Sequence, residues 1–272
     1  MPALLKKYKL NAGGLIGIVL LSIVVLLAVF APVLPIPDPV KVDLLARMRG
    51  PFAFSASGTL SHLAGTDQLG RDLLARVLFG ARVTLSIVAI AVLISAAVGV
   101  VLGLISGFFG GMLDRLLMRL VDLQLAFPLM LLALTVISVM GPSAANLIAV
   151  LALAGWVRFA RIVRGEVIAL RGLEFVLAAR AAGASNLRIM FRHILPNVLA
   201  PILVIGTLEV ARMILLESSL SFLGLGTQPP DPSWGRMLAD GRSYLANAWW
   251  ISAVPGVAIL ITVLSINLLG DY

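Results

Sequence analysis

The side chains that could carry chemistry are few in this chain, and their spacing excludes most enzymatic sites. Cysteine is absent, and His62 and His193 are too few to build a histidine metal site. No lysine follows a glycine, so the phosphate-binding G-x-x-x-x-G-K-[ST] loop cannot form. Neither H-E-x-x-H nor G-x-S-x-G occurs. We therefore expect no catalytic residue, no bound metal and no cofactor in this chain.

The composition of the chain indicates whether its surface is covered by water or by lipid. Hydrophobic residues make up 60% of the chain and charged residues only 12%. A soluble domain carries roughly 25% charged residues, which it needs to cover its surface. The net charge of +8 does not indicate nucleic-acid binding, because the basic residues flank apolar runs, as they do in membrane proteins. The sequence predicts an integral membrane protein.

Apolar runs long enough to cross about 30 Å of hydrocarbon predict the helices. The uncharged run 123–157 is too long for one crossing, and Gly141-Pro142-Ser143 supplies a turn near its middle. The first run follows lysines but is too long for a signal peptide, so we expect it to be retained. An all-α, polytopic protein with six transmembrane helices is predicted, near residues 13–34, 83–108, 123–140, 144–163, 199–222 and 249–269.

The distribution of basic residues predicts the orientation. An even number of spans places both termini on one side of the membrane, together with the arginines between residues 158 and 192. Lysine and arginine accumulate on the cytoplasmic side of membrane proteins. We therefore expect a multi-pass protein whose two termini lie in the cytoplasm.

Several ionisable residues fall within or beside the predicted spans. Such residues usually face the bundle interior or a wet path. Glu209 and Arg212 are i,i+3 neighbours, so they either neutralise each other or line a translocation path. Glu217 is expected near an outer gate. The charged residues of 114–122 are expected to pair with one another at an inner turn.

The longest inner connection is the basic segment 164–201. Glu174–Met190 has a helical composition that Gly183 interrupts, and Asn186 is a possible helix start. Pro196 is expected to stop the second helical piece before the next span. Without further information, this segment could be an interfacial helix with its arginines among lipid headgroups.

Two outer segments punctuated by proline and glycine lie on the opposite side. The first, 35–80, ends in 71–78, which reads as a short amphipathic helix on the membrane surface. The second, 224–247, is expected to contain a helical stretch after Trp234. Trp249 and Trp250 follow at the expected depth of an interfacial aromatic belt.

The inner segment also resembles a known motif. Glu174–Gly183 (E-F-V-L-A-A-R-A-A-G) and His193–Asn197 (H-I-L-P-N) are similar to the cytoplasmic loop of ABC importer permeases, E-A-A-x-x-x-G followed nine residues later by I-x-L-P. Leu177 stands where that motif has its glutamate, and His193 takes the isoleucine position. Any contact made by the missing glutamate must be absent or moved to Glu174.

Other motifs extend the resemblance along the chain. The chain resembles the dipeptide, oligopeptide and nickel permease group, specifically the subunit with an extra N-terminal span. A type I ABC importer permease fold is implied, with a tail and first span in 1–36, an outer loop in 37–80, and a five-helix core in 81–272 that includes the coupling loop 164–197. The further matching segments are 62–72 (H-L-A-G-T-D-Q-L-G-R-D), 221–226 (S-F-L-G-L-G), 228–230 (Q-P-P), 232–235 (P-S-W-G) and 267–271 (N-L-L-G-D).

The resemblance implies a function and a set of partners. The chain would be the permease subunit of an ATP-driven importer in the bacterial inner membrane, forming the path for di- or oligopeptides. Its partners would be a homologous permease subunit, two ATPase subunits that bind the ATP, and an extracytoplasmic solute-binding protein docked on the outer segments. No nucleic acid is expected. The residues implied in coupling to the ATPase are Glu174, Ala178, Ala179, Arg180, Gly183, Leu187, Arg188, His193, Leu195 and Pro196.

Within that loop, we expect three apolar residues to anchor the ATPase, namely Leu187, Ile189 and Met190. Three alternatives stay open for the function. The same machinery could import nickel or a metal chelate. A proton-coupled secondary transporter using Glu209 and Glu217 is a less favoured alternative, because neither inverted repeats nor broken helices are evident in the sequence. An intramembrane enzyme is the weakest alternative.

Overall fold

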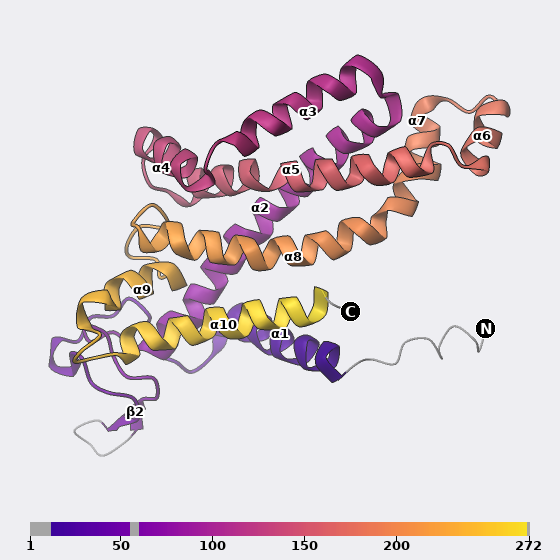
Figure 1. Ribbon diagram of the computed structural model, residues 1–272. Helices are drawn as coiled ribbons and strands as arrows, with labels where there is room; N and C mark the ends of the chain where they lie inside the picture. The colour runs from indigo at the N-terminus through magenta and orange to yellow at the C-terminus, as the bar shows by residue number, and fades with distance from the viewer. Residues whose placement is uncertain (1–11, 55–59, 271–272) are drawn as a thin grey trace. The chain divides into compact units, whose positions relative to one another are not determined.

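The computed structural model describes residues 12–54 and 60–270, which are almost entirely helical (Figure 1). They form two compact units. The first unit contains the described residues of Met1–Val88, Gly141–Leu147 and Val210–Tyr272. The second unit contains Ala89–Met140 and Ile148–Glu209. Three long helices, α2, α5 and α8, contribute residues to both units.

The first unit is built around the packing of two apolar helices, α1 (Ala12–Phe30) and α10 (Trp250–Gly270). They lie side by side in Figure 1. A Cβ atom added to Gly17 of α1 would lie 2.8 Å from the carbonyl oxygen of Ser265, so only glycine permits this close approach. Helix α9 (Trp234–Gly241) packs against α10 as well.

Short elements connect the helices of the first unit. They are the 3₁₀-helices η1 (Ala31–Val33), η2 (Leu44–Ala46) and η4 (Arg242–Tyr244), and the strands β1 (Ala53–Phe54) and β2 (Leu60–His62). The two strands pair antiparallel, with Ala53 opposite His62. The start of α2 (Leu73–Phe109) and the end of α8 (Leu195–Phe222) complete this unit.

The second unit contains the remainder of α2 and α8, and α5 (Ala144–Leu170) from Ile148 onward. It also contains α3 (Gly111–Ala126), α4 (Leu129–Met140), α6 (Glu174–Ala181) and α7 (Asn186–Ile189). A π-helical turn, η3 (Met190–Ile194), joins α7 to α8.

Within the second unit, α2 and α5 approach closely through small residues. A Cβ atom added to Gly103 would lie 2.7 Å from the carbonyl oxygen of Ala160, and one added to Gly107 would lie 2.7 Å from Cβ of Val167. The backbones of the two helices can therefore touch, as small residues allow in membrane bundles.

Five described helical segments have the length and apolar composition of a membrane span. They are Ala12–Val33, Leu73–Phe109, Ala144–Leu170, Asn186–Phe222 and Trp250–Gly270. The pair α3–α4 passes the same test only when taken together, and it is bent by 85°. Counted as one span, this pair brings the number to six, in agreement with the sequence prediction. The predicted all-α, polytopic fold is confirmed.

The third predicted span differs in form from the prediction of one straight helix over 123–140. Phe127 has an extended conformation (φ −90°, ψ 129°) at the end of α3, and Pro128 follows. A residue before proline is disfavoured in the helical region, and the proline itself has no N–H to donate. The chain therefore turns sharply at this point.

The separate surface helix expected at 71–78 is also wrong. Asp72 caps α2 by accepting a hydrogen bond from the Ala75 backbone N–H at 2.8 Å, and the helix then continues without interruption to Phe109. Leu73 and Ala75 are buried in the first unit, so this turn is a packed part of α2. The helical stretch expected after Trp234 is present as α9.

Candidate functional site

The segment between α5 and α8 folds as two short helices joined by a tight turn at Gly183. Gly183 has φ +80°, in the left-handed region. Its N–H donates to the Arg180 carbonyl and the Ala184 N–H donates to the Ala179 carbonyl, both at 3.0 Å. This pair of bonds is a Schellman motif, which ends a helix at a glycine. The predicted break at Gly183 is confirmed.

The constraint at Gly183 is conformational. A Cβ atom added there would find no atom of the chain within 4 Å. A side chain at this φ costs about 1 kcal/mol relative to glycine. Within this chain, glycine is needed to make the turn, and the space around it is open to a partner.

Helix α7 begins at Asn186, as expected, with Ser185 as its cap. The Ser185 hydroxyl accepts a hydrogen bond from the Arg188 N–H at 3.4 Å. The expectation that Pro196 stops this piece is wrong, because the helical path runs on through the π turn η3 into α8. The turn closes with a bond from the Leu195 N–H to the Met190 carbonyl. A π turn next to a proline accommodates the backbone N–H that the proline lacks.

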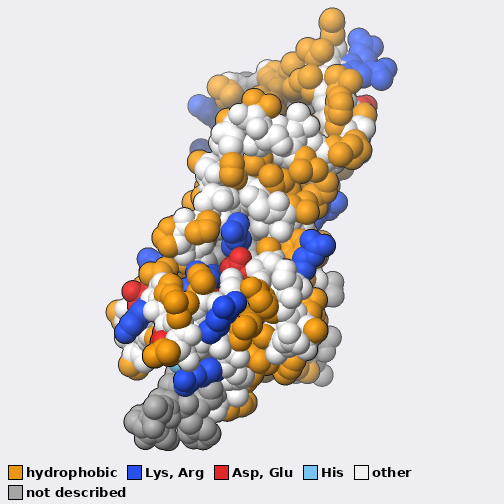
Figure 2. Space-filling model, turned by 90° about the vertical axis from the view of Figure 1, so that its left-hand side faces the viewer, with side chains coloured by type: hydrophobic (Ala, Val, Ile, Leu, Met, Phe, Trp, Pro, Cys, Tyr) orange, Lys and Arg blue, Asp and Glu red, His pale blue; other side chains and the backbone are white. Residues whose placement is uncertain are grey.

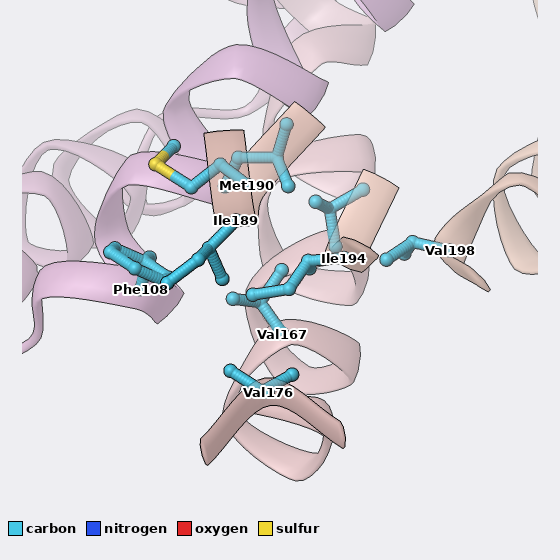
Figure 3. Packing of buried hydrophobic residues seen from close by; sticks show 9 residues of the cluster. Phe108, Val167, Val176, Ile189, Met190, Ile194 and Val198 are labelled. Atoms are coloured by element: carbon cyan, nitrogen blue, oxygen red, sulfur yellow. The ribbon is translucent and has the colours of Figure 1, made fainter. Parts of the chain in front are cut away.

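One face of this segment is buried in a cluster of apolar side chains (Figure 3). Figure 3 shows Ile189 beside Phe108 of α2, and Ile194 beside Val167 of α5. Ile189, Ile194 and Val167 are completely buried. The cluster consists of Leu104, Phe108, Val163, Val167, Val176, Ile189, Met190, Ile194 and Val198. The segment is therefore packed onto the ends of α2 and α5 as one piece.

The opposite face exposes apolar side chains. Leu187 is 66% exposed and Leu177 is 49% exposed, and Phe175 and Phe191 are also exposed. Two of the three anchors predicted for a partner are therefore wrong, because Ile189 and Met190 belong to the buried cluster. Of the three, only Leu187 points away from it.

The remaining residues predicted to act in coupling lie on or beside this exposed face. Arg180 stacks over the ring of Phe108, with its guanidinium carbon 5.8 Å from the ring centroid. Among the others, Glu174, Ala178, Arg188 and Pro196 are exposed, whereas Ala179, His193 and Leu195 are half-buried. The structure thus brings the set together in one segment.

Ion pairs within the second unit were missed from the sequence. Asp114 of α3 accepts two bonds from Arg164 of α5, at 2.5 and 2.7 Å, and Asp122 pairs with Arg161 at 2.7 Å. Both carboxylates were expected to pair inside the 114–122 group, and both instead reach α5. The nearby arginines, Arg115 and Arg119, gave no signal that Asp114 pairs with a residue 50 positions away.

Glu209 of α8 has a charged partner in the second unit. Its side chain is 1% exposed, and one carboxylate oxygen lies 3.6 Å from Nη1 of Arg158 on α5. Arg158 itself is 54% exposed. The sequence suggested Arg212 as the neutralising group for Glu209, and the structure adds Arg158 from a different helix.

Glu217, in the first unit, is buried among hydroxyl groups. Its carboxylate accepts a hydrogen bond from Ser221 at 2.7 Å and another from Ser218 at 3.4 Å. The Thr84 hydroxyl of α2 bonds to the same carboxylate and accepts from the backbone N–H of Trp234 at 3.4 Å. Two of the sequence motifs, 221–226 and 232–235, therefore meet around this carboxylate.

Comparison with known proteins gives a consistent result. Residues 99–272 match the family model described as "Binding-protein-dependent transport system inner membrane component". A putative peptide transport system permease protein of Brucella suis is 47% identical over 256 residues, covering 94% of this chain and 84% of the relative. The dipeptide transport system permease protein DppC of Escherichia coli K12 is 44% identical, covering 97% of this chain and 88% of the relative.

Solved structures show the same fold. A chain of the inward-facing MetNI methionine ABC transporter superposes with a TM-score of 0.59 at 20% identity, covering 72% of this chain and 93% of that one. A chain of an amino acid ABC transporter solved with histidines gives a TM-score of 0.56 at 17% identity, covering 73% of this chain and 92% of that one. The architecture is that of type I ABC importer permeases.

Proposed function

This chain belongs to the family of binding-protein-dependent transport system inner membrane components, and we propose that it carries di- or oligopeptides across the membrane in an ATP-driven importer. It is a permease subunit of an ABC importer. In the proposed complex it pairs with a homologous permease, two ATPase subunits and an extracytoplasmic binding protein. ATP is bound by the ATPase subunits. The named activity of the relatives, peptide or dipeptide transport, supports peptides over nickel as the cargo.

The two-faced segment between α5 and α8 is the observation that carries this proposal. One face is fixed to α2 and α5 by the buried cluster, and the other presents exposed apolar side chains centred on Leu187. An exposed apolar patch of this kind is typical of a protein-docking surface. A groove on the ATPase would cover it.

Movement of a docked partner would pass into the bundle through the same segment. Well-packed interiors transmit displacement because they have low compressibility. Ile189 lies against Phe108 near the end of α2, and Ile194 lies against Val167 of α5. The Arg171 guanidinium also donates to the carbonyl oxygen of Gly107 at 2.9 Å. When ATP closes the ATPase pair, the segment and both helix ends would shift together.

The alternation of the spans gives the proposed orientation. The α5–α8 segment and the N-terminus lie on one side of the membrane, and the loops before α2 and after α8 lie on the other. Basic residues in the segment favour the cytoplasm for the first side. Both termini are then cytoplasmic, and the loops before α2 and after α8 face the binding protein.

Co-purification tests the proposal. Leu187→Ala removes the most exposed apolar side chain of the segment, whereas Leu45→Ala makes the same change at a leucine that is 90% exposed on the opposite side. We expect Leu187→Ala to reduce the amount of ATPase recovered with the permease at least fivefold, while Leu45→Ala leaves it unchanged. Equal recovery with both variants would contradict the proposal.

A further inference from the structure

A polar cavity of about 200 Å³ lies in the loop region of the first unit. It is formed by the segment that leads into α2 and by the segment around α9. Three arginines line it, Arg71, Arg76 and Arg236, together with Asp231 and Asp240. Figure 2 shows blue and red side chains near one another in its lower half, among orange and white ones.

The arginines of this cavity share two carboxylates, Asp240 of the lining and Asp67, which is not part of the lining. Asp67, which is 2% exposed, lies 2.6 Å from Nε of Arg71 and 3.5 Å from Nε of Arg76. Asp240 lies 3.8 Å from Nη2 of Arg71, 3.5 Å from Nη2 of Arg76 and 3.3 Å from Nε of Arg236. Three guanidinium groups are therefore held by two shared carboxylates.

The second carboxylate of the lining, Asp231, is exposed. Water and salt screen an exposed charge far more than a buried one. Three guanidinium groups of the lining therefore stand against one less screened carboxylate of the lining, Asp240. Such a lining favours an additional carboxylate.

One nitrogen of Arg76 has no hydrogen-bond partner among the described residues. The Arg76 side chain is 3% exposed, and its Nε and Nη2 face the two aspartates while Nη1 is left over. Oε1 of Gln68, which also lines the cavity, is unpartnered as well. Rotation of that amide by half a turn would present its NH₂ group instead. Two residues of the lining would then each have an N–H group without an acceptor.

We infer that this cavity receives the carboxylate of an acidic side chain from the extracytoplasmic binding protein. Guanidinium groups bind carboxylates through short, charge-assisted hydrogen bonds of defined geometry. The cavity lies among loops, at the end of the first unit that the proposed orientation places outside the cell. The inference rests on the proposed function, because that function supplies the partner. It adds the residues and the chemical group by which the partner is recognised.

The experiment measures binding of the purified, dialanine-loaded binding protein to the complete importer in lipid nanodiscs. Arg76→Lys keeps a charge beside Asp67 and Asp240 but removes the unpartnered nitrogen Nη1. Leu69→Trp fills the cavity from a residue that is 37% exposed and leaves every ion pair in place. Arg47→Gln removes an exposed arginine of the same loop and serves as the control.

We expect Arg76→Lys and Leu69→Trp each to raise the Kd at least tenfold, and Arg47→Gln to change it less than twofold. If Arg76→Lys and Leu69→Trp both bind within twofold of wild type, the cavity holds only water and the inference is overturned. If the wild-type importer itself does not bind the protein, the proposed function fails instead. Recovery of the ATPase subunits with each variant verifies that the importer has assembled.

Two further arms identify the source of the carboxylate. In the first arm, each surface Asp or Glu of the binding protein is replaced by its amide. One of these variants should bind the wild-type importer tenfold more weakly. The same variant should bind the Arg76→Lys importer no more weakly than the unchanged binding protein does. The second arm compares the binding protein loaded with dialanine and with dialanine amide. Equal binding is expected. A loss of binding with the amide alone would assign the carboxylate to the peptide and overturn the inference.

Discussion

The α5–α8 segment and the loop cavity are stabilised by opposite means. The segment is held by a cluster of apolar side chains that includes Ile189 and Val176, and its outer face is apolar again. The loop cavity is held by ion pairs centred on Asp67 and Asp240, and one buried guanidinium nitrogen of its lining has no partner among the described residues. One region therefore suits a partner that supplies a hydrophobic groove, and the other suits a partner that supplies a carboxylate.

This difference separates the two tasks proposed for the subunit. Apolar packing is non-directional and tolerates small shifts, so a coupling element built from it can move while staying docked. Buried ion pairs depend on distance and direction, which makes a site built from them selective for one chemical group. Substitutions that remove apolar packing from the segment or ion pairs from the cavity should therefore differ in their effects on stability and on binding.

The largest effect is expected where a buried charge loses its partner. Asp67→Ala leaves the buried guanidinium of Arg76 with Asp240 alone, and breaking a buried pair costs about 3–5 kcal/mol. We expect the purified subunit to lose stability by that order in thermal unfolding followed by fluorescence. Asp231→Ala, at an exposed carboxylate of the same cavity, should change stability by less than about 0.5 kcal/mol. Equal effects would show that the ion pairs do not hold this region.

The next effect separates the two faces of the α5–α8 segment. Ile189→Ala opens a gap in the buried cluster and should cost about 2–4 kcal/mol in unfolding free energy. Leu187→Ala, two residues earlier, should leave stability within about 0.5 kcal/mol and weaken ATPase binding instead. If Leu187→Ala is the more destabilising of the two, the assignment of buried and exposed faces is wrong.

A smaller effect is expected at the turn between α6 and α7. Gly183→Ala forces a side chain into φ +80° and should cost about 1 kcal/mol. Gly172→Ala is a matched control, since that glycine is exposed and has no positive φ. Gly183→Arg places a long side chain on the docking face as well. It should abolish peptide uptake while ATP hydrolysis and membrane insertion continue; normal uptake by this variant would contradict coupling through the segment.

The smallest effect is expected at Glu209. Its carboxylate is buried and lies beside Arg158, which favours charge neutralisation over contact with cargo. We expect the double exchange Glu209→Gln, Arg212→Met to leave the rate of dipeptide uptake in proteoliposomes within about twofold of wild type. A rate more than tenfold lower at unchanged protein level would favour a place for these residues in the translocation path.

Local features of the candidate site could be predicted from the sequence. Gly183 signals a helix end because its φ is unrestricted, and Ser185 and Asn186 signal the next start. The number of spans follows from length and hydrophobicity alone. These features depend on residues close together in the chain.

Features that depend on tertiary packing could not be predicted. Leu187 and Ile189 of α7 lie about 200° apart around the helix, and only the packing of α7 on α2 decides that Ile189 is the one that faces inward. The pairing of Asp114 with Arg164 joins two helices whose proximity no local pattern reveals. Pro128 signals a break, but the 85° bend depends on how α3 and α4 pack.

Thiol labelling at Leu187 tests docking of the ATPase on the α5–α8 segment, because the chain contains no cysteine of its own. The variants Leu187→Cys and Leu45→Cys are treated with a membrane-permeant maleimide, with and without the ATPase subunits. We expect Leu187→Cys to be labelled in the permease without the ATPase and protected at least fivefold in the complete importer. Leu45→Cys should be labelled equally in both. Equal labelling of Leu187→Cys with and without the ATPase would contradict docking at this face.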